Sequence, residues 1–188
     1  MFEVERFIAD CESAAVAGGQ EAVREVLVRA IADPAGIMTV LGEPRRAELN
    51  VLHRSQRLTI LNVLWPPHHT QTPHDHRIWA EIGVYAGRED NIFWRRCPPD
   101  GRWRIEAIGA ASVCTGACHS LRQDAIHSVT NPVDSITAGL HVYGGDLAIQ
   151  PRSMWDGETL VEAPIDHARD YRAMDVYNAS LFRQDAGV

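Results

Sequence analysis

The chain has 188 residues, of which 45% are hydrophobic and 23% charged, and its formal net charge is −7. This length allows a full core in one domain, and the composition is typical of a globular protein. The negative charge argues against a nucleic-acid partner, because such binding depends on Lys and Arg side chains that neutralise phosphates. No apolar run reaches the ~18 residues needed to cross a bilayer, so we expect no membrane partner.

The amino terminus and the cysteines indicate the compartment. Residues 1–6 are acidic where a signal peptide would be basic, and no small-residue cleavage site follows an apolar core. The four cysteines are too few and too scattered for a disulfide framework. We therefore expect a cytoplasmic protein.

Residues 1–45 are predicted to form a helical lead-in. Apolar residues recur near helical spacing up to Gly18-Gly19, which should interrupt the helix. A second helix fits residues 20–31, and Asp33-Pro34 should end it. These helices are expected to cover one face of a sheet from outside.

Residues 46–150 have the pattern of a barrel core. Short β-type runs are predicted over residues 50–53, 58–65, 78–85, 91–95, 103–107, 112–114, 127–130 and 136–143. Turn signals separate these runs, including a hairpin turn at residues 54–57 and a turn at residues 98–101. Many short strands at this spacing favour a mainly β sandwich or barrel over a βαβ fold. Residues 151–188 are interpreted as a C-terminal extension with a loosely ordered polar tail, within the same single domain.

Two histidines separated by one residue are the first candidates for chemistry. They lie in Pro73-His74-Asp75-His76, and side chains at i and i+2 of a strand point to the same face. Imidazole is a ligand for zinc, copper, iron and nickel, so the pair is half of a candidate metal site. A short pair of this kind is a weak signal alone, and Glu81 and His127 at fixed spacings strengthen it.

Residues 73–83 resemble the first motif of the cupins. The spacing of the second motif is matched by Gly116, His127 and Asn131, although Arg122 and Asp124 stand where cupins usually have Pro and Gly. The resemblance implies a small double-stranded β-helix barrel in which both motifs lie on neighbouring strands. It also implies a ligand set of His74, His76 and His127, with Glu81 as a candidate fourth ligand.

Glu81 has two interpretations. As a ligand it would add negative charge and occupy one open position of the ion, whereas as an outer residue it would hydrogen-bond around the site. A plainer alternative makes His74 and His76 surface loop residues and leaves Glu81 exposed. His119 is the rival of His127 as third ligand, but it lacks the following Asn at the motif's spacing.

A narrower resemblance covers residues 45–150 and points to the thiol dioxygenases, the group of cysteine dioxygenase and 3-mercaptopropionate dioxygenase. It lies in the strand ending at Trp65, in the His-x-His segment with Trp79, and in residues 127–131. Gly139-Leu140-His141-Val142-Tyr143 resembles the family's Ser-x-His-x-Tyr triad, with glycine in place of serine. The resemblance implies that Tyr143 donates a hydrogen bond to oxygen or substrate at the iron, and that His141 orients its hydroxyl. The alternative is an ordinary strand with an inward, hydrogen-bonded pair.

The chain departs from that family in two places. Glu81 stands where animal cysteine dioxygenases have the crosslinking cysteine, so no Cys–Tyr cofactor forms there. The family's carboxylate-binding arginine is missing at its expected position, near Leu49. Arg54, Arg57 and Arg77 are candidate replacements, because a guanidinium fork binds carboxylates, although a surface charge is the favoured interpretation of each. Trp65 and Trp79 are candidate pocket walls.

The leading hypothesis is a mononuclear Fe(II) enzyme that oxidises a small thiol with O2 to a sulfinate. Mn, Ni or Zn are alternative metals, because the same imidazoles serve several ions. A second hypothesis is another cupin metalloenzyme with three His and one Glu, acting as a dioxygenase of a non-thiol substrate, an isomerase or a hydrolase. A third is a non-catalytic, ligand-binding cupin. The expected partners are a small-molecule substrate and O2, and a homodimer is one option for assembly.

Overall fold

The structure is a computed structural model that describes residues 1–97 and 104–185. Its helices are α1 (Val4–Ile31), α2 (Pro34–Leu41) and α3 (His167–Asp185). Its strands are β1 (Glu48–Arg54), β2 (Thr59–Trp65), β3 (Thr70–Asp75), β4 (Ala80–Ala86), β5 (Arg88–Arg96), β6 (Ile105–Cys114), β7 (Cys118–Leu121), β8 (Ile126–Thr130), β9 (Thr137–Tyr143), β10 (Ser153–Trp155) and β11 (Glu162–Pro164). The turn predicted at residues 98–101 and the start of the strand predicted at residue 103 lie outside the described residues.

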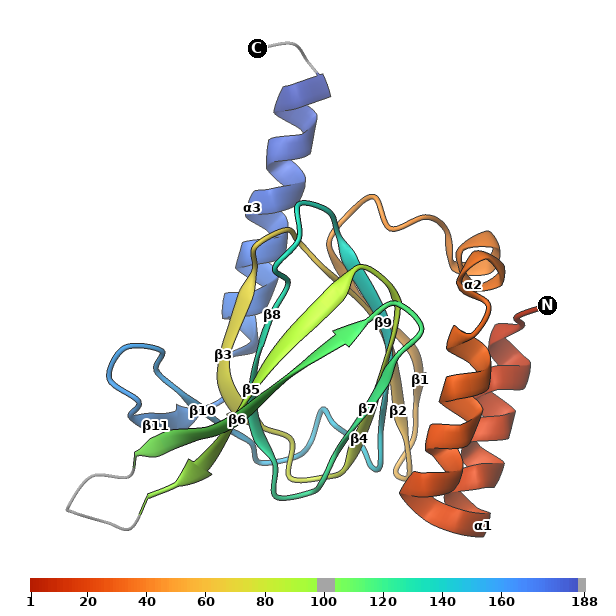
Figure 1. Ribbon diagram of the computed structural model, residues 1–188, viewed down its shortest axis with the longest axis horizontal. Coiled ribbons are helices and arrows are strands. Elements are labelled where there is room, and N and C mark those ends of the chain that lie inside the picture. Colours follow the sequence, from red (N-terminus) through yellow and green to blue (C-terminus); the bar gives the residue numbers. More distant parts are fainter. Residues whose placement is uncertain (98–103, 186–188) are drawn as a thin grey trace.

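The strands form a double-stranded β-helix (Figure 1). Within the described ranges, one sheet has the order β1-β2-β9-β4-β7 and the other the order β11-β10-β3-β8-β5-β6. Antiparallel pairing joins β5 to β6, β4 to β7, β3 to β8 and β2 to β9. The two halves of the barrel therefore run side by side as one long hairpin that coils between both sheets, which is the jelly-roll arrangement of cupins. The predicted mainly β cupin barrel is confirmed.

Helices α1 and α2 pack on the outer face of the β1-β2-β9-β4-β7 sheet, as predicted (Figure 1). The break expected at Gly18-Gly19 is confirmed, because Gly19 has φ 64° and ψ −146° and kinks α1. Gly83 of β4 allows α1 to approach closely. A Cβ atom at Gly83 would lie 2.9 Å from Leu27 Cγ and 3.0 Å from Ile31 Cγ2.

Helices α2 and α3 are differences from the prediction. Asp33-Pro34 was expected to end a helix, and it also begins the next one, because the Asp33 carboxylate accepts a hydrogen bond from the Gly36 amide and proline suits the first turn. Helix α3 lies in the region expected to be loosely ordered. It packs on the barrel through Met174, which contacts a cluster that includes Trp65, and through Asn178, whose side chain hydrogen-bonds both backbone groups of Ala47.

Strand β9 shows how one sheet serves two buried layers. Its residues are all buried. Ala138, Leu140 and Val142 belong to the core beneath the helices. His141 and Tyr143 point into the barrel, since His141 contacts Glu89 and Tyr143 lines the barrel pocket. The alternation of side chains along a strand thus separates a structural face from a chemical one.

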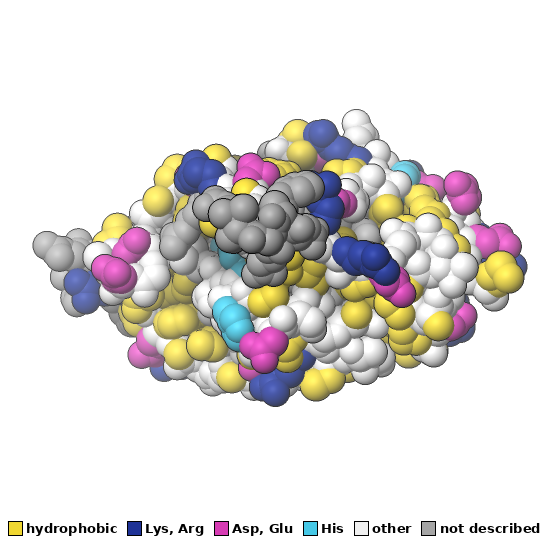
Figure 2. All heavy atoms as spheres, turned by 90° about the horizontal axis from the view of Figure 1, so that it is seen from above, with side chains coloured by type: hydrophobic (Ala, Val, Ile, Leu, Met, Phe, Trp, Pro, Cys, Tyr) yellow, Lys and Arg dark blue, Asp and Glu magenta, His cyan; other side chains and the backbone are white. Residues whose placement is uncertain are grey.

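Charged side chains of both signs lie scattered among hydrophobic and polar ones over the described part of the face in Figure 2. None of the helices in the described ranges combines the length and apolar character needed to cross a membrane.

Candidate metal centre

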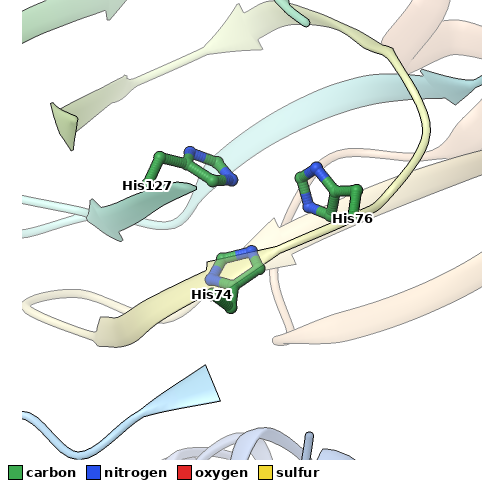
Figure 3. Close-up of side chains that lie close together, drawn as sticks. All are labelled: His74, His76 and His127. Carbon is green, nitrogen blue, oxygen red and sulfur yellow. The ribbon is translucent and has the colours of Figure 1, made fainter. Parts of the chain in front are cut away.

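Three buried histidines converge inside the barrel. His74 is on β3, His127 on β8, and these two residues are directly paired across the strands. His76 follows β3 by one position. One ring nitrogen from each lies within 4.8 Å of the others, and the three rings point toward one another (Figure 3). The structure therefore brings together the three histidines that the His-x-His spacing and the second motif indicated.

The surroundings of the three rings favour neutral, oriented imidazoles. Burial lowers the pKa of His76 and of His127 well below the usual range, and the neighbouring histidines add to the shift. His74 Nδ1 lies 2.9 Å from the Thr72 carbonyl, and His127 Nδ1 lies 2.8 Å from Asn91 Oδ1. Such partners fix the ring orientation of metal-binding histidines. The Asn91 contact was not predicted from the sequence.

The opposite edge of His127 faces the cluster. Its Nε2 atom is buried and has no hydrogen-bond partner among the described residues. A buried polar atom of this kind requires an explanation, because desolvation without a partner is costly. An ion held by the three histidines would provide the partner, so the donor set fits a transition metal.

A pocket of about 310 Å³ opens onto this cluster. Its lining includes His74 and His76, and it also includes Trp65 and Arg54, two of the expected pocket residues. Leu61, Val63, Tyr143 and Arg152 also line this pocket. Tyr171 of α3 borders the same pocket, so the unpredicted helix forms part of its rim.

Arg152 is the residue of this pocket that sequence reasoning missed. It is 92% buried, since its relative exposure is 8%. Its positive charge contributes to lowering the pKa of both His76 and Tyr143, which places the guanidinium close to the chemical face of the pocket. Arg54, in contrast, is exposed at the rim and forms two hydrogen bonds with Asp146, of 2.8 and 3.1 Å.

Glu81 is not brought to the histidines. It lies on the face of β4 that is turned to α1, where its carboxylate accepts hydrogen bonds from Gln20 Nε2 and Ser120 Oγ, both at 2.9 Å. The carboxylate is fully buried, and burial raises its pKa although these donors oppose the shift. The reason is strand register: Ala80 and Ile82 take the inward positions of β4, so Glu81 points outward.

We expect the Glu81→Ala variant to keep its metal content while losing about 1–3 kcal/mol of stability, because the Gln20 and Ser120 donors would lose their buried acceptor. Metal analysis and urea unfolding of the same preparation measure both quantities. Loss of most of the metal from a folded variant would instead indicate that Glu81 is a metal ligand.

Two further candidates lie away from the pocket. Trp79 packs against Gly144, where a Cβ atom would come within 2.0 Å of the indole, and it contacts the core under α1. Arg77 pairs with the buried Asp75 through Nε at 2.5 Å and lines a different surface groove. Neither side chain walls the histidine pocket. His119, the rival third ligand, stacks on Phe93 and is not in the cluster.

His141 and Tyr143 lie beside the cluster and are hydrogen-bonded to each other. His141 Nδ1 is 3.2 Å from the Tyr143 hydroxyl, and the Tyr143 ring is 5.0 Å from the ring of His76, centroid to centroid. Burial raises the pKa of Tyr143 well above its usual range, so its phenol stays protonated. The other edge of His141 contacts Glu89, a residue that the sequence did not single out.

No family model matches the chain. Among solved structures, the chain is similar to DMSP lyase DddQ from Ruegeria pomeroyi, with 17% identity and a TM-score of 0.45 over 60% of this chain and 53% of that one. It is also similar to the protein TT1209 from Thermus thermophilus, with 17% identity and a TM-score of 0.40 over 55% and 87% of the two chains. A third similar structure is oxalate decarboxylase from Bacillus subtilis, with 16% identity and a TM-score of 0.39. That match covers 49% of this chain and 22% of the decarboxylase, so the chain corresponds to about a fifth of that protein's length.

Proposed function

We propose that the protein is a mononuclear metalloenzyme of the thiol-dioxygenase type, with His74, His76 and His127 as the ligands of Fe(II). The observation that carries the proposal is the buried cluster itself, whose ring nitrogens lie within 4.8 Å of one another at the base of a pocket. Three neutral imidazoles leave open positions on an octahedral ion for a substrate and a second small molecule. Mn, Ni and Zn suit the same ligands, and the choice of Fe(II) follows from the proposed reaction with O2.

When bound, Fe(II) would supply the redox chemistry by which both atoms of O2 are transferred to a thiol sulfur, so that RSH and O2 give the sulfinic acid RSO2H. The residues of the chain bind and orient the substrate, and they exclude water from the pocket. Leu61, Val63 and Trp65 provide an apolar wall on β2. Tyr143 places a protonated phenol at the edge of the cluster.

Arg152 supports a narrower substrate class, a small thiol that carries a carboxylate. Its guanidinium lies in the same pocket as His74 and His76 and within electrostatic reach of Tyr143. A planar, permanently charged fork is suited to bind a carboxylate through two hydrogen bonds. We propose that Arg152 has the role for which Arg54, Arg57 and Arg77 were considered.

The proposal is tested with protein loaded anaerobically with Fe(II) and mixed with O2 and a panel of thiols. We expect O2 uptake with a short thiol carboxylate and one sulfinate formed for each O2 consumed, detected by an oxygen electrode and mass spectrometry. Zn-loaded protein is the control, because Zn²⁺ has no redox chemistry. Absence of uptake with every thiol, in protein that holds iron stoichiometrically, would overturn the assignment.

A further inference from the structure

Glu89 on β5 is a buried carboxylate that belongs to neither the metal-binding motifs nor the His141–Tyr143 pattern. It is fully buried, and it points into the barrel like Phe93 and Asn91 on the same strand. One carboxylate oxygen, Oε1, lies 3.1 Å from Trp65 Nε1 and 3.2 Å from His141 Nε2. The carboxylate therefore joins the wall of the pocket to the His141–Tyr143 pair.

The chemistry of these partners sets the direction of every hydrogen bond. The indole nitrogen of Trp65 only donates, and an ionised carboxylate only accepts. With Glu89 Oε1 as the acceptor in both contacts, His141 Nε2 carries the proton of the hydrogen bond to Glu89. In a neutral ring the other nitrogen, Nδ1, is unprotonated, and it can accept a hydrogen bond from the Tyr143 hydroxyl, 3.2 Å away.

Gly139 provides the space for this arrangement. A Cβ atom at Gly139 would lie 3.1 Å from His141 Nε2 and 3.2 Å from the Gly83 carbonyl. A side chain at this position would press on the ring edge that meets Glu89. The glycine that replaces the serine of the family pattern is thus coupled to a carboxylate on another strand.

We propose that Glu89 is a positioning residue that holds His141 as the Nε2–H tautomer, so that the Tyr143 hydroxyl donates its hydrogen bond to the unprotonated His141 Nδ1. The Tyr143 oxygen then has only its lone pairs to offer to the pocket, so a group that hydrogen-bonds to it there must be a donor. This differs from the family expectation, in which Tyr143 donates into the pocket. The role of this arrangement in catalysis rests on the proposed function, whereas the assignment of the His141 tautomer does not.

The test is long-range ¹H–¹⁵N NMR of histidine-labelled, full-length protein with Zn²⁺ added as a diamagnetic ion. The ¹⁵N shifts separate protonated from unprotonated ring nitrogens, and His141→Gln identifies the signals of His141. We expect His141 to show a protonated Nε2 and an unprotonated Nδ1. A proton on Nδ1 in the wild-type protein, in either the other tautomer or the imidazolium, would overturn the proposal even if Zn²⁺ does not bind.

Glu89→Gln and Glu89→Leu form a matched pair. Both donors meet Oε1, while Oε2 has no hydrogen-bond partner among the described residues, so the amide of the Gln variant retains the acceptor and breaks no contact. We expect Gln to preserve the wild-type tautomer and Leu to shift the His141 ring toward the tautomer that is protonated at Nδ1. An unchanged tautomer in a folded Leu variant contradicts the proposal, and the wild-type spectrum decides the matter if that variant does not fold.

Discussion

Replacing His127 with alanine is expected to lower the affinity for Fe(II) by at least about 100-fold, the upper end of what removal of an outer-sphere partner of a metal ligand costs. His127 contributes one of three converging imidazoles, and its Nε2 atom has no other hydrogen-bond partner in the described structure. Metal analysis after anaerobic loading with Fe(II), at several free metal concentrations, measures the change. Circular dichroism establishes that the barrel is still folded.

His119→Ala is the matched control for this experiment. His119 is also a barrel histidine, but it stacks on Phe93 at 5.1 Å between ring centroids and is not part of the cluster. Its removal should leave the metal content unchanged. Equal metal loss in both variants would mean that the His127 substitution lowers metal content by destabilising the fold. Loss only in the His119 variant would identify His119 as the third ligand.

Arg152→Gln is expected to raise the KM for a thiol carboxylate by about 10- to 100-fold, because a hydrogen bond to a charged group contributes about 1.5–3 kcal/mol. The expectation follows from the position of Arg152 beside His74 and His76. For a thiol of equal length that carries an amine in place of the carboxylate, the same substitution should leave KM nearly unchanged or lower it. Initial rates of O2 uptake over a range of thiol concentrations provide both KM values.

Two variants sharpen this experiment. Arg54→Gln removes a positive charge from the rim of the same pocket, where the guanidinium is already paired with Asp146. It should change KM by less than about threefold, as expected for an exposed pair. Arg152→Lys keeps the charge and loses the fork, so it should fall between wild type and Gln. Equal effects at Arg54 and Arg152 would exclude a specific clamp.

The barrel was predictable because its signals are local. Alternation of apolar and polar residues indicates strands, and Gly18-Gly19 and Asp33-Pro34 mark helix boundaries that the structure contains. Helix α3 also has a local signal that low hydrophobicity obscured. Asp166 caps its start by accepting from the Ala168 amide, and Met174 and Tyr177, three residues apart, face the barrel.

Much of the site was not predictable from short motifs, because strand pairing assembles it from distant segments. Asn91 reaches His127 because β5 pairs with β8, whereas Glu89 reaches His141 from the opposite sheet. The two-residue spacing of Glu89 and Asn91 was the only sequence signal for their role, since two polar residues on one face of a buried strand need hydrogen-bond partners. Arg152 comes from an irregular segment before β10, where neither period nor motif marks it.

Glu81 shows the limit of motif spacing. The distance from His76 matches the cupin pattern, yet the side chain is on the helix side of β4. Spacing along the chain does not state which face of a strand a residue takes after an intervening turn. A one-residue difference in register exchanges the inner and outer faces.

The long coiled hairpin of the barrel has a consequence for folding. His74 and His127 face each other across β3 and β8, but the chain between them forms a loop on the order of 50 residues, whose closure has an entropic cost. An ion bound to both would act as a removable crosslink between the two halves of the chain. Chelation would then weaken the resistance of the barrel to unfolding without breaking a covalent bond.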